Sequence, residues 1–207
     1  MSEPDPQSLK LIGGRLCLDF INTVDCRNSD HPREVLSTYP NLVSWSQHAN
    51  VLTQNEAKDL LREADIHPAE ARIVLERAIT TREVLHRIFS AIAKHRLPAV
   101  NDTGVLNAEM SIAMSQMHLK PASPPNPWTY TFEERKLDQM LWPIIHSASE
   151  LLTSDKLDRI CECPGENCGW LFIDMSRNRS RRWCDMKDCG NRAKARRHYQ
   201  TTHGNRS

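Results

Sequence analysis

The sequence predicts a mainly α-helical protein, in which a helical N-terminal domain with a small β-hairpin precedes a compact cysteine-rich module. Three observations support this fold class. Apolar residues recur at helical spacing through most of the chain, one proline-rich segment alternates like a strand, and five of the seven cysteines follow residue 160. A length of 207 residues with 39% hydrophobic content allows one well-packed domain and one small module.

The first predicted helices follow one another directly. The segment GGRLCLDFINTV clusters apolar side chains with the spacing of a buried helix. Two amphipathic helices come next, with Asn41 as the predicted cap of the first and Thr53 with Glu56 as a capping box for the second. Pro68 then ends the second helix, because proline cannot continue an α-helix.

The longest predicted helix runs from Ala69 to His95 and forms the spine of the domain, and a further helix spans residues 103–117. Four prolines exclude a helix from the segment HLKPASPPNPWTYTF, whose last five residues alternate aromatic and threonine side chains. We therefore expect MHLKP and WTYTF to pair as a β-hairpin.

The helical pattern returns over residues 133–152, where Pro143 is expected to kink the helix. Six apolar residues of this segment are expected to face the core: Leu137, Met140, Leu141, Ile144, Ile145 and Leu151. A boundary is predicted near residues 153–158, which divides the chain into a helical domain, residues 1–154, and the module, residues 155–207.

The net charge of +1 hides a strong asymmetry. Residues 1–155 carry 15 Lys and Arg against 20 Asp and Glu, whereas residues 156–207 carry 12 against 6. An acidic body with a basic end indicates that only the end meets a polyanion.

Four cysteines of the module form two pairs, each with four residues between its members, and fifteen residues separate the pairs. This pattern is typical of a four-thiolate zinc site, because each pair reaches one ion from a tight turn and the span returns the chain. Pro164, Gly165 and Gly169 supply the turn residues of the first pair. The predicted zinc ligands are Cys163, Cys168, Cys184 and Cys189.

Cys161 competes with Cys163 for the first ligand position, and Cys163 is favoured because Pro164 follows it directly. Cys17 and Cys26 lie far away in the sequence and are assigned no chemistry, since an isolated cysteine near apolar residues is usually a small buried hydrophobe.

The residues between the pairs predict a hairpin and then a helix. GWLFID has the alternation of a short strand, MSRNRS is a turn, and RRWC is the predicted returning strand. Cys189 then lies in the first turn of a basic helix. A turn, a hairpin and a helix in this order predict a treble-clef-like zinc module, in which the metal fastens a helix that lacks an apolar face. Trp170 and Trp183 are expected to form the core of this module.

Nine Lys and Arg side chains fall within residues 176–199. A solvated face that offsets the charge of the zinc site needs only two or three, so the excess favours nucleic acid, and Arg forks suit phosphates and guanine edges. We expect duplex DNA, with Arg192 and Arg196 in the groove and Arg181 and Arg182 on the backbone. The nine residues are Arg177, Arg179, Arg181, Arg182, Lys187, Arg192, Lys194, Arg196 and Arg197.

The segment CGWLFIDMSRNRSRRWCDMKDCGNRAKARRHY resembles the CGNR zinc finger, whose name is the tetrapeptide at residues 189–192. Upstream, GGRLCLDFINTV, LVSW and ASELLTSDKLDRI resemble the ABATE domain, and the two resemblances cover nearly the whole chain. They imply a bacterial transcription regulator with a helical domain that senses stress or a ligand and a zinc module that binds DNA. The metal cysteines that the resemblance implies are those that the spacing predicts.

Two other function classes stay open. Treble-clef modules also carry nucleases, and His198, Asn178 and Asp174 could then supply a base and metal ligands. Because few histidines lie near the finger, we expect no enzyme and no catalytic residue. A zinc-stapled protein-interaction module is the remaining alternative.

A polar stripe runs through GGRLCLDFINTV if this segment is a helix. One interpretation is a hydrogen-bonded network that locks the helix to its neighbours. The other is a pocket for a small-molecule effector, closed by the long helix that carries Arg82 and His86. The residues of the stripe are Arg15, Asp19, Asn22 and Thr23.

The polar start of the chain does not resemble a signal peptide, and no apolar run approaches the ~20 residues that a membrane span needs, so we expect a cytoplasmic protein. In that reducing compartment, clustered cysteines indicate metal chemistry rather than disulfides. One small finger buries little surface, so we expect sequence-specific binding to require a homodimer through the N-terminal domain.

Overall fold

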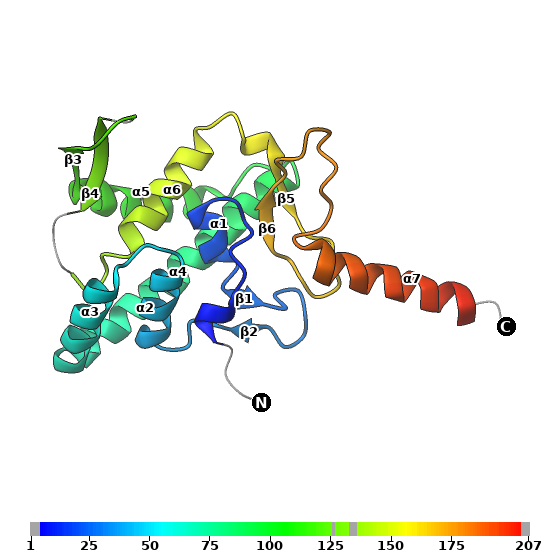
Figure 1. Cartoon of the computed structure of the whole chain (residues 1–207), viewed down its shortest axis with the longest axis horizontal. Coiled ribbons are helices and arrows are strands. Elements are labelled where there is room, and N and C mark those ends of the chain that lie inside the picture. The colour runs from blue at the N-terminus through cyan, green and yellow to red at the C-terminus, as the bar shows by residue number, and fades with distance from the viewer. Residues whose placement is uncertain (1–4, 126, 133–135, 204–207) are drawn as a thin grey trace.

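The computed structural model describes residues 5–125, 127–132 and 136–203 of the chain. Helices make up most of it, the sheets are small and two-stranded, and the cysteine-rich module forms its C-terminal end (Figure 1). The predicted fold class, mainly α with a terminal metal module, is confirmed. Among the described residues, no helix combines the length and apolar character needed to cross a membrane.

The first helix is shorter than the sequence predicts. Helix α1 (Leu16–Ile21) is short and is capped by Asn22. The chain then continues into strand β1 (Val24–Asp25). This strand pairs antiparallel with β2 (Arg33–Glu34). Periodicity alone does not separate a short buried helix from a strand, which is why the predicted helix runs too far.

The next two helices, α2 (Tyr39–His48) and α3 (Gln54–Ile66), begin and end close to their predicted limits. The capping box of α3 is confirmed. Asn41 is not the cap of α2. Thr38 takes that role, because proline is tolerated in the first turn and the helix therefore starts ahead of Asn41.

Three helices build the core around α1. The spine is α4 (Pro68–Ala93), which starts at the proline that ends the preceding helix and packs against α5 (Val100–Ser115). The third, α6 (Leu141–Leu152), packs on α1 and α5. The six core residues predicted for this region are all buried, although Leu137 and Met140 precede the helix, which starts later than predicted. Pro143 falls in the first turn of α6 and not in its middle, so it has no helical segment to kink. Residues 133–135 of the predicted helix lie outside the described residues.

The predicted hairpin is confirmed as β3 (Met117–Pro121) paired with β4 (Trp128–Phe132). Its strands align Met117 with Phe132 and Pro121 with Trp128. Short 3₁₀ turns, η1 (Pro6–Ser8) and η2 (Leu157–Arg159), lie near the start of the chain and after α6.

The C-terminal module consists of β5 (Ile160–Glu162), β6 (Leu171–Ile173), a π-helical turn η3 (Met186–Gly190) and the basic helix α7 (Asn191–His203). GWLFID forms strand β6 as predicted, but RRWC is not its partner. The antiparallel partner is β5, which precedes the first cysteine pair.

The edge of β6 that faces away from β5 is already hydrogen-bonded, which explains why RRWC does not pair there. The side-chain amide of Asn22 accepts the backbone N–H of Leu171 at 2.8 Å and donates to the carbonyl of the same residue at 2.8 Å. Two residues on, the backbone N–H of Ile173 donates to the Gly13 carbonyl at 2.9 Å. The N-terminal segment thus takes the edge that a third strand would use.

Further contacts join the module to the body. The indole Nε1 of Trp170 donates to the Val24 carbonyl at 2.9 Å, and Arg181 donates to the Ile12 carbonyl at 3.1 Å. Ile160, Leu171 and Ile173 belong to the same apolar core as the helices. The division into residues 1–154 and 155–207 therefore stays a prediction, and in space the two parts share one core.

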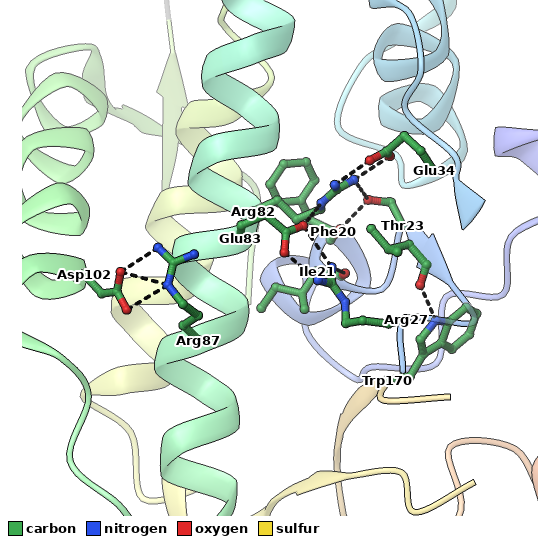
Figure 2. A network of polar contacts seen from close by, with 11 residues as sticks. Phe20, Ile21, Thr23, Arg27, Glu34, Arg82, Glu83, Arg87, Asp102 and Trp170 are labelled. Atoms are coloured by element: carbon green, nitrogen blue, oxygen red, sulfur yellow. Dashed lines mark hydrogen bonds and ion pairs between the residues drawn. The ribbon is translucent and has the colours of Figure 1, made fainter. Parts of the chain in front are cut away.

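A buried ion-pair network fastens α4 to the β1–β2 region (Figure 2). Arg82 is 2% exposed and donates to both carboxylate oxygens of Glu34 at 2.6 Å and to the Thr23 hydroxyl at 3.1 Å. Glu83 binds Arg82 and also Arg27. Each buried charge has an opposite charge beside it, which is the condition for tolerating charges in a core.

We predict that Asn22→Ala lowers the free energy of unfolding by about 2–4 kcal/mol, because a buried N–H and a buried carbonyl of Leu171 would each lose their partner. Urea unfolding measures the change. The control is Asn101→Ala on the exposed side of α5, which should change stability by less than about 0.5 kcal/mol. Equal effects of the two substitutions would contradict the pairing.

Candidate metal centre and basic helix

Four cysteine side chains meet at the centre of the C-terminal module. The sulfurs of Cys163, Cys168, Cys184 and Cys189 all lie within 4.8 Å of one another, and all four residues are buried. The Sγ atoms of Cys168 and Cys184 are 3.5 Å apart, and those of Cys184 and Cys189 are 3.6 Å apart. Tetrahedral coordination at a zinc–sulfur distance of about 2.3 Å places sulfurs about 3.8 Å apart, so the donor set fits such an ion.

Local structure holds each sulfur in place. Cys163 directly follows β5 and Cys168 precedes β6, so the first pair occupies the loop of this hairpin. Gly165 is required in that loop, because a Cβ atom there would lie 3.0 Å from the Cys189 sulfur. Gly169 has φ +73°, and a Cβ atom there would also collide with Asn28.

Cys163 and not Cys161 belongs to the cluster. Cys161 pairs with Phe172 inside the sheet, and its thiol faces the Arg159 carbonyl at 3.7 Å. The cysteine that leaves the strand, where the turn begins, is the one that reaches the other sulfurs.

The environments of the cysteines differ in charge. Contacts from the thiols of Cys168 and Cys184 lower the pKa of Cys163, as expected where one sulfur of a cluster carries negative charge. Burial raises the pKa of Cys17 to about 12, which keeps it a neutral core side chain. Cys26 is half-buried, and burial raises its pKa as well.

The basic helix α7 projects from the body at the C-terminal end of the molecule (Figure 1). Of its residues up to Thr202, Ala193 is half-buried and the others are exposed. The predicted helix without an apolar face is therefore present, and its first turn follows Cys189 directly.

Several of the nine predicted nucleic-acid contacts have partners inside the protein. Arg181 donates to carbonyls of Ile173, Ile12 and Cys184, and its guanidinium lies 4.3 Å from the centre of the Phe172 ring. The remaining pairs are Arg179 with Asp158 at 2.7 Å, Arg196 with Glu166, and Arg192 with the Cys189 sulfur at 3.2 Å.

The other basic side chains are exposed. Within the described part of the chain, no salt bridge involves Arg177, Arg182, Lys187, Lys194 or Arg197. Lys194 lies on the side of α7 opposite to Arg192, because successive helical residues are turned by about 100°. Arg197 lines the same hollow as Arg192 and Arg196.

The two tryptophans of the module are partly buried, as predicted for its core. Trp170 is tied to the Val24 carbonyl, and the Arg182 guanidinium lies 5.1 Å from the centre of the Trp183 ring. A hollow of about 610 Å³ separates α7 from the first cysteine pair, with Trp183 and Arg196 among its lining residues.

The polar stripe of GGRLCLDFINTV is divided between two environments. Asn22 and Thr23 are buried and bonded to Leu171 and Arg82 respectively, so the network interpretation accounts for both. Asp19 accepts the Gly13 N–H at 2.7 Å on another side of α1. Burial raises the pKa of Asp19 to about 6, although this hydrogen bond acts in the opposite direction.

A second hollow, of about 500 Å³, opens beside Asp19 and Arg15 against α6. His146 and Glu150 of α6 also line it. The predicted effector pocket stays a prediction, confined to this side of the stripe. Arg82 does not close it, because its guanidinium is occupied by Glu34, Thr23 and Glu83.

Two family models match the chain. Residues 14–155 match ABATE, described as "Putative stress-induced transcription regulator", and residues 159–201 match the CGNR zinc finger. The resemblance stated from the sequence is thereby confirmed, in the same order along the chain. A search of the curated proteins finds no match.

We predict that Asp19→Asn gains stability relative to the native protein as the pH rises from 4 to 7. Because the fold raises the pKa of this carboxyl to about 6, the native protein binds the proton more tightly than the unfolded chain and loses stability as the pH rises through this window. The difference reaches up to about 3 kcal/mol. Urea unfolding of both proteins across this range measures it, and parallel curves would contradict the buried carboxyl.

Proposed function

Because the chain belongs to the ABATE family and ends in a CGNR zinc finger, we propose that it is a zinc-containing transcription regulator whose C-terminal module binds duplex DNA. The observation that carries this proposal is the basic helix α7, which projects from the body and has its first turn at the four-cysteine cluster. A charged helix in this position faces water or phosphate and contributes nothing to a core.

The ion at the cluster is zinc in this proposal. Four thiolates that surround one ion leave no open coordination position, which is typical of a structural and not a catalytic zinc site. Zinc bound there supplies folding free energy, roughly 10 kcal/mol or more in small modules. Cys184 and Cys189 hold the turn that starts α7, and Cys163 and Cys168 hold the hairpin that packs on the body. Because the cysteines must be reduced, we place the protein in the cytoplasm.

We assign the DNA-facing side of α7 to Lys194 and Arg197, supported by Arg177 and Arg182. These side chains have no salt bridge among the described residues, whereas Arg192 donates to a sulfur and Arg196 pairs with Glu166. This differs from the sequence-based choice of Arg192 and Arg196 for the groove. Side chains that already have partners in the protein must give them up before they bind phosphate.

An effector would bind in the hollow beside Asp19, with Arg15 as the positive side chain. A hydrogen-bond path leads from there to the module: Asp19 accepts the Gly13 N–H, and the Gly13 carbonyl accepts the Ile173 N–H. A ligand that changes the position of Asp19 would therefore act on β6. A homodimer through the N-terminal domain completes the proposal, because one finger contacts too few base pairs for strong specificity.

A nuclease is less well supported than a regulator. Asp174, a potential second-metal ligand, is buried, and its carboxylate accepts the backbone N–H groups of Ser176 and Arg181 at 2.8 and 2.9 Å. It closes the turn before RRWC and does not face His198 across an open site. We therefore propose that the protein binds DNA and has no catalytic residues.

We predict one zinc ion per chain and its loss in Cys184→Ser, together with the order of α7, since zinc binding and folding of such modules are coupled. Elemental analysis measures zinc, and amide hydrogen exchange of residues 191–202 measures the order of the helix. Cys161→Ser is the matched control and should keep one zinc ion, because this thiol lies outside the cluster. A native protein without zinc, or an unchanged zinc content in Cys184→Ser, would contradict the proposal.

We predict a salt dependence for DNA binding. The five basic side chains without a salt bridge among the described residues give a slope of log affinity against log salt near −4 to −5, because each phosphate contact contributes about −0.9. Replacing Lys194 and Arg197 together by Ala should make the slope less steep by about two and weaken binding on every duplex. Fluorescence anisotropy with labelled duplexes at several salt concentrations measures both quantities.

The control for this experiment is the pair Lys58→Ala and Arg72→Ala on exposed positions of the helical body, which should leave the slope unchanged. The same protein with magnesium or manganese should shift plasmid DNA without cutting it. Absence of binding at low salt would reject the DNA-binding proposal, and cleavage would favour the nuclease.

A further inference from the structure

Arg192 makes a contact that a DNA-binding arginine does not need. It lies at the second position of α7, three residues after Cys189, and this helical spacing brings its side chain back over the metal cluster. Its Nη2 atom donates to the Cys189 sulfur at 3.2 Å. A guanidinium cannot be deprotonated at physiological pH, so it places a permanent positive charge on this sulfur.

The Cys189 sulfur differs from the other three sulfurs of the cluster in one contact. Among the described residues, it is the one for which a hydrogen bond from a charged side chain is found, that of Arg192. A single substitution at Arg192 therefore removes this contact.

Arg192 also lines two openings that reach the cluster. One is the hollow of about 610 Å³ between α7 and the loop of the first cysteine pair, and the other, of about 360 Å³, lies toward the N-terminal segment. Cys189 lines both of them as well. Removing the Arg192 side chain would therefore widen the access to this cysteine.

Another positive charge near the second pair is engaged elsewhere. Lys10 bridges Asp185 and Asp188 at 2.5 Å each, so it neutralises those carboxylates and not the sulfurs. Four thiolates around one zinc ion carry a net charge of −2. Arg192 therefore offsets negative charge of the thiolates, which Lys10 does not neutralise.

We propose that Arg192 is a positioning residue of the metal centre, which holds and shields the Cys189 thiolate and does not contact nucleic acid. The inference rests on the zinc part of the proposed function and is independent of the DNA part. Outer hydrogen bonds of this kind orient metal ligands and change metal affinity, typically by about 10–100-fold when they are lost.

The first experiment is chelator competition on the zinc-loaded full-length protein. Arg192→Ala should lower zinc affinity by about 10–100-fold, and Arg192→Lys should lower it less, because the ammonium keeps the charge but not the planar fork. The matched control is Lys194→Ala, which also removes one positive charge from α7 but lies on the side opposite to Arg192, outside the hollow beside Cys189, and should leave zinc affinity unchanged.

The second experiment measures the rate at which iodoacetamide alkylates each cysteine, located by peptide mass spectrometry. In Arg192→Ala with zinc bound, Cys189 should be alkylated faster than in the native protein, while Cys163 should change little. This readout is taken on folded, loaded protein, so it separates loss of shielding from a failure to fold.

Equal zinc affinity and equal Cys189 alkylation in Arg192→Ala and Lys194→Ala would overturn the inference, even if the native protein binds zinc and DNA. So would a loss of DNA affinity in Arg192→Ala with zinc affinity unchanged. A native protein that binds no zinc would overturn the metal part of the proposed function itself, and the two failures are thereby distinguished.

Discussion

The arrangement of the molecule depends on the hydrogen bonds between the N-terminal segment and the edge of β6 that faces away from β5. A two-stranded sheet is marginally stable alone, and β5 covers one edge of β6. Asn22 and Gly13 complete the other edge at Leu171 and Ile173, in place of a third strand. Because buried backbone groups without partners cost about 1–3 kcal/mol each, this pairing holds the metal module to the helical body.

A module held in this way cannot swing as a unit unless these hydrogen bonds break. The N-terminal segment adds to the restraint, since Lys10 bridges Asp185 and Asp188 and the Ile12 carbonyl accepts from Arg181. The helix α7 is the element that remains exposed along its length. In the proposed regulator, a signal received by the body would reach the basic helix through the segment before α1, which contacts Asp185, Asp188 and Ile173, or through a change in the sheet itself.

The sequence predicts those features whose physical cause lies within a few residues. The capping box at Thr53, the helix limit at Pro68 and the paired cysteines are of this kind. The hydrogen bond of Asn22 could not be predicted from the sequence, because its partner Leu171 lies 149 residues further along the chain. Periodicity carries no information on such distant partners. The same bond takes the edge of β6 from RRWC, so this unseen contact accounts for the wrongly predicted strand. Lys10 carries no sequence signal of its role, since an isolated lysine in a polar segment is ordinary.

The fold shows that part of the positive charge of the C-terminal module is already paired within the protein. Counting side chains gives nine positive charges, but Arg179, Arg181, Arg192 and Arg196 each have a partner within the protein. These partners are carboxylates, carbonyls and a sulfur of the module itself, so a share of its basic residues serves its own folding. Of the five other basic side chains, all exposed, Lys194 and Arg197 lie on α7, and Arg177, Arg182 and Lys187 precede it. In two copies joined through their bodies, the distance between these helices would be set by the dimer and not by the finger, which makes spacing between half-sites, rather than contacts of one helix, the expected source of specificity.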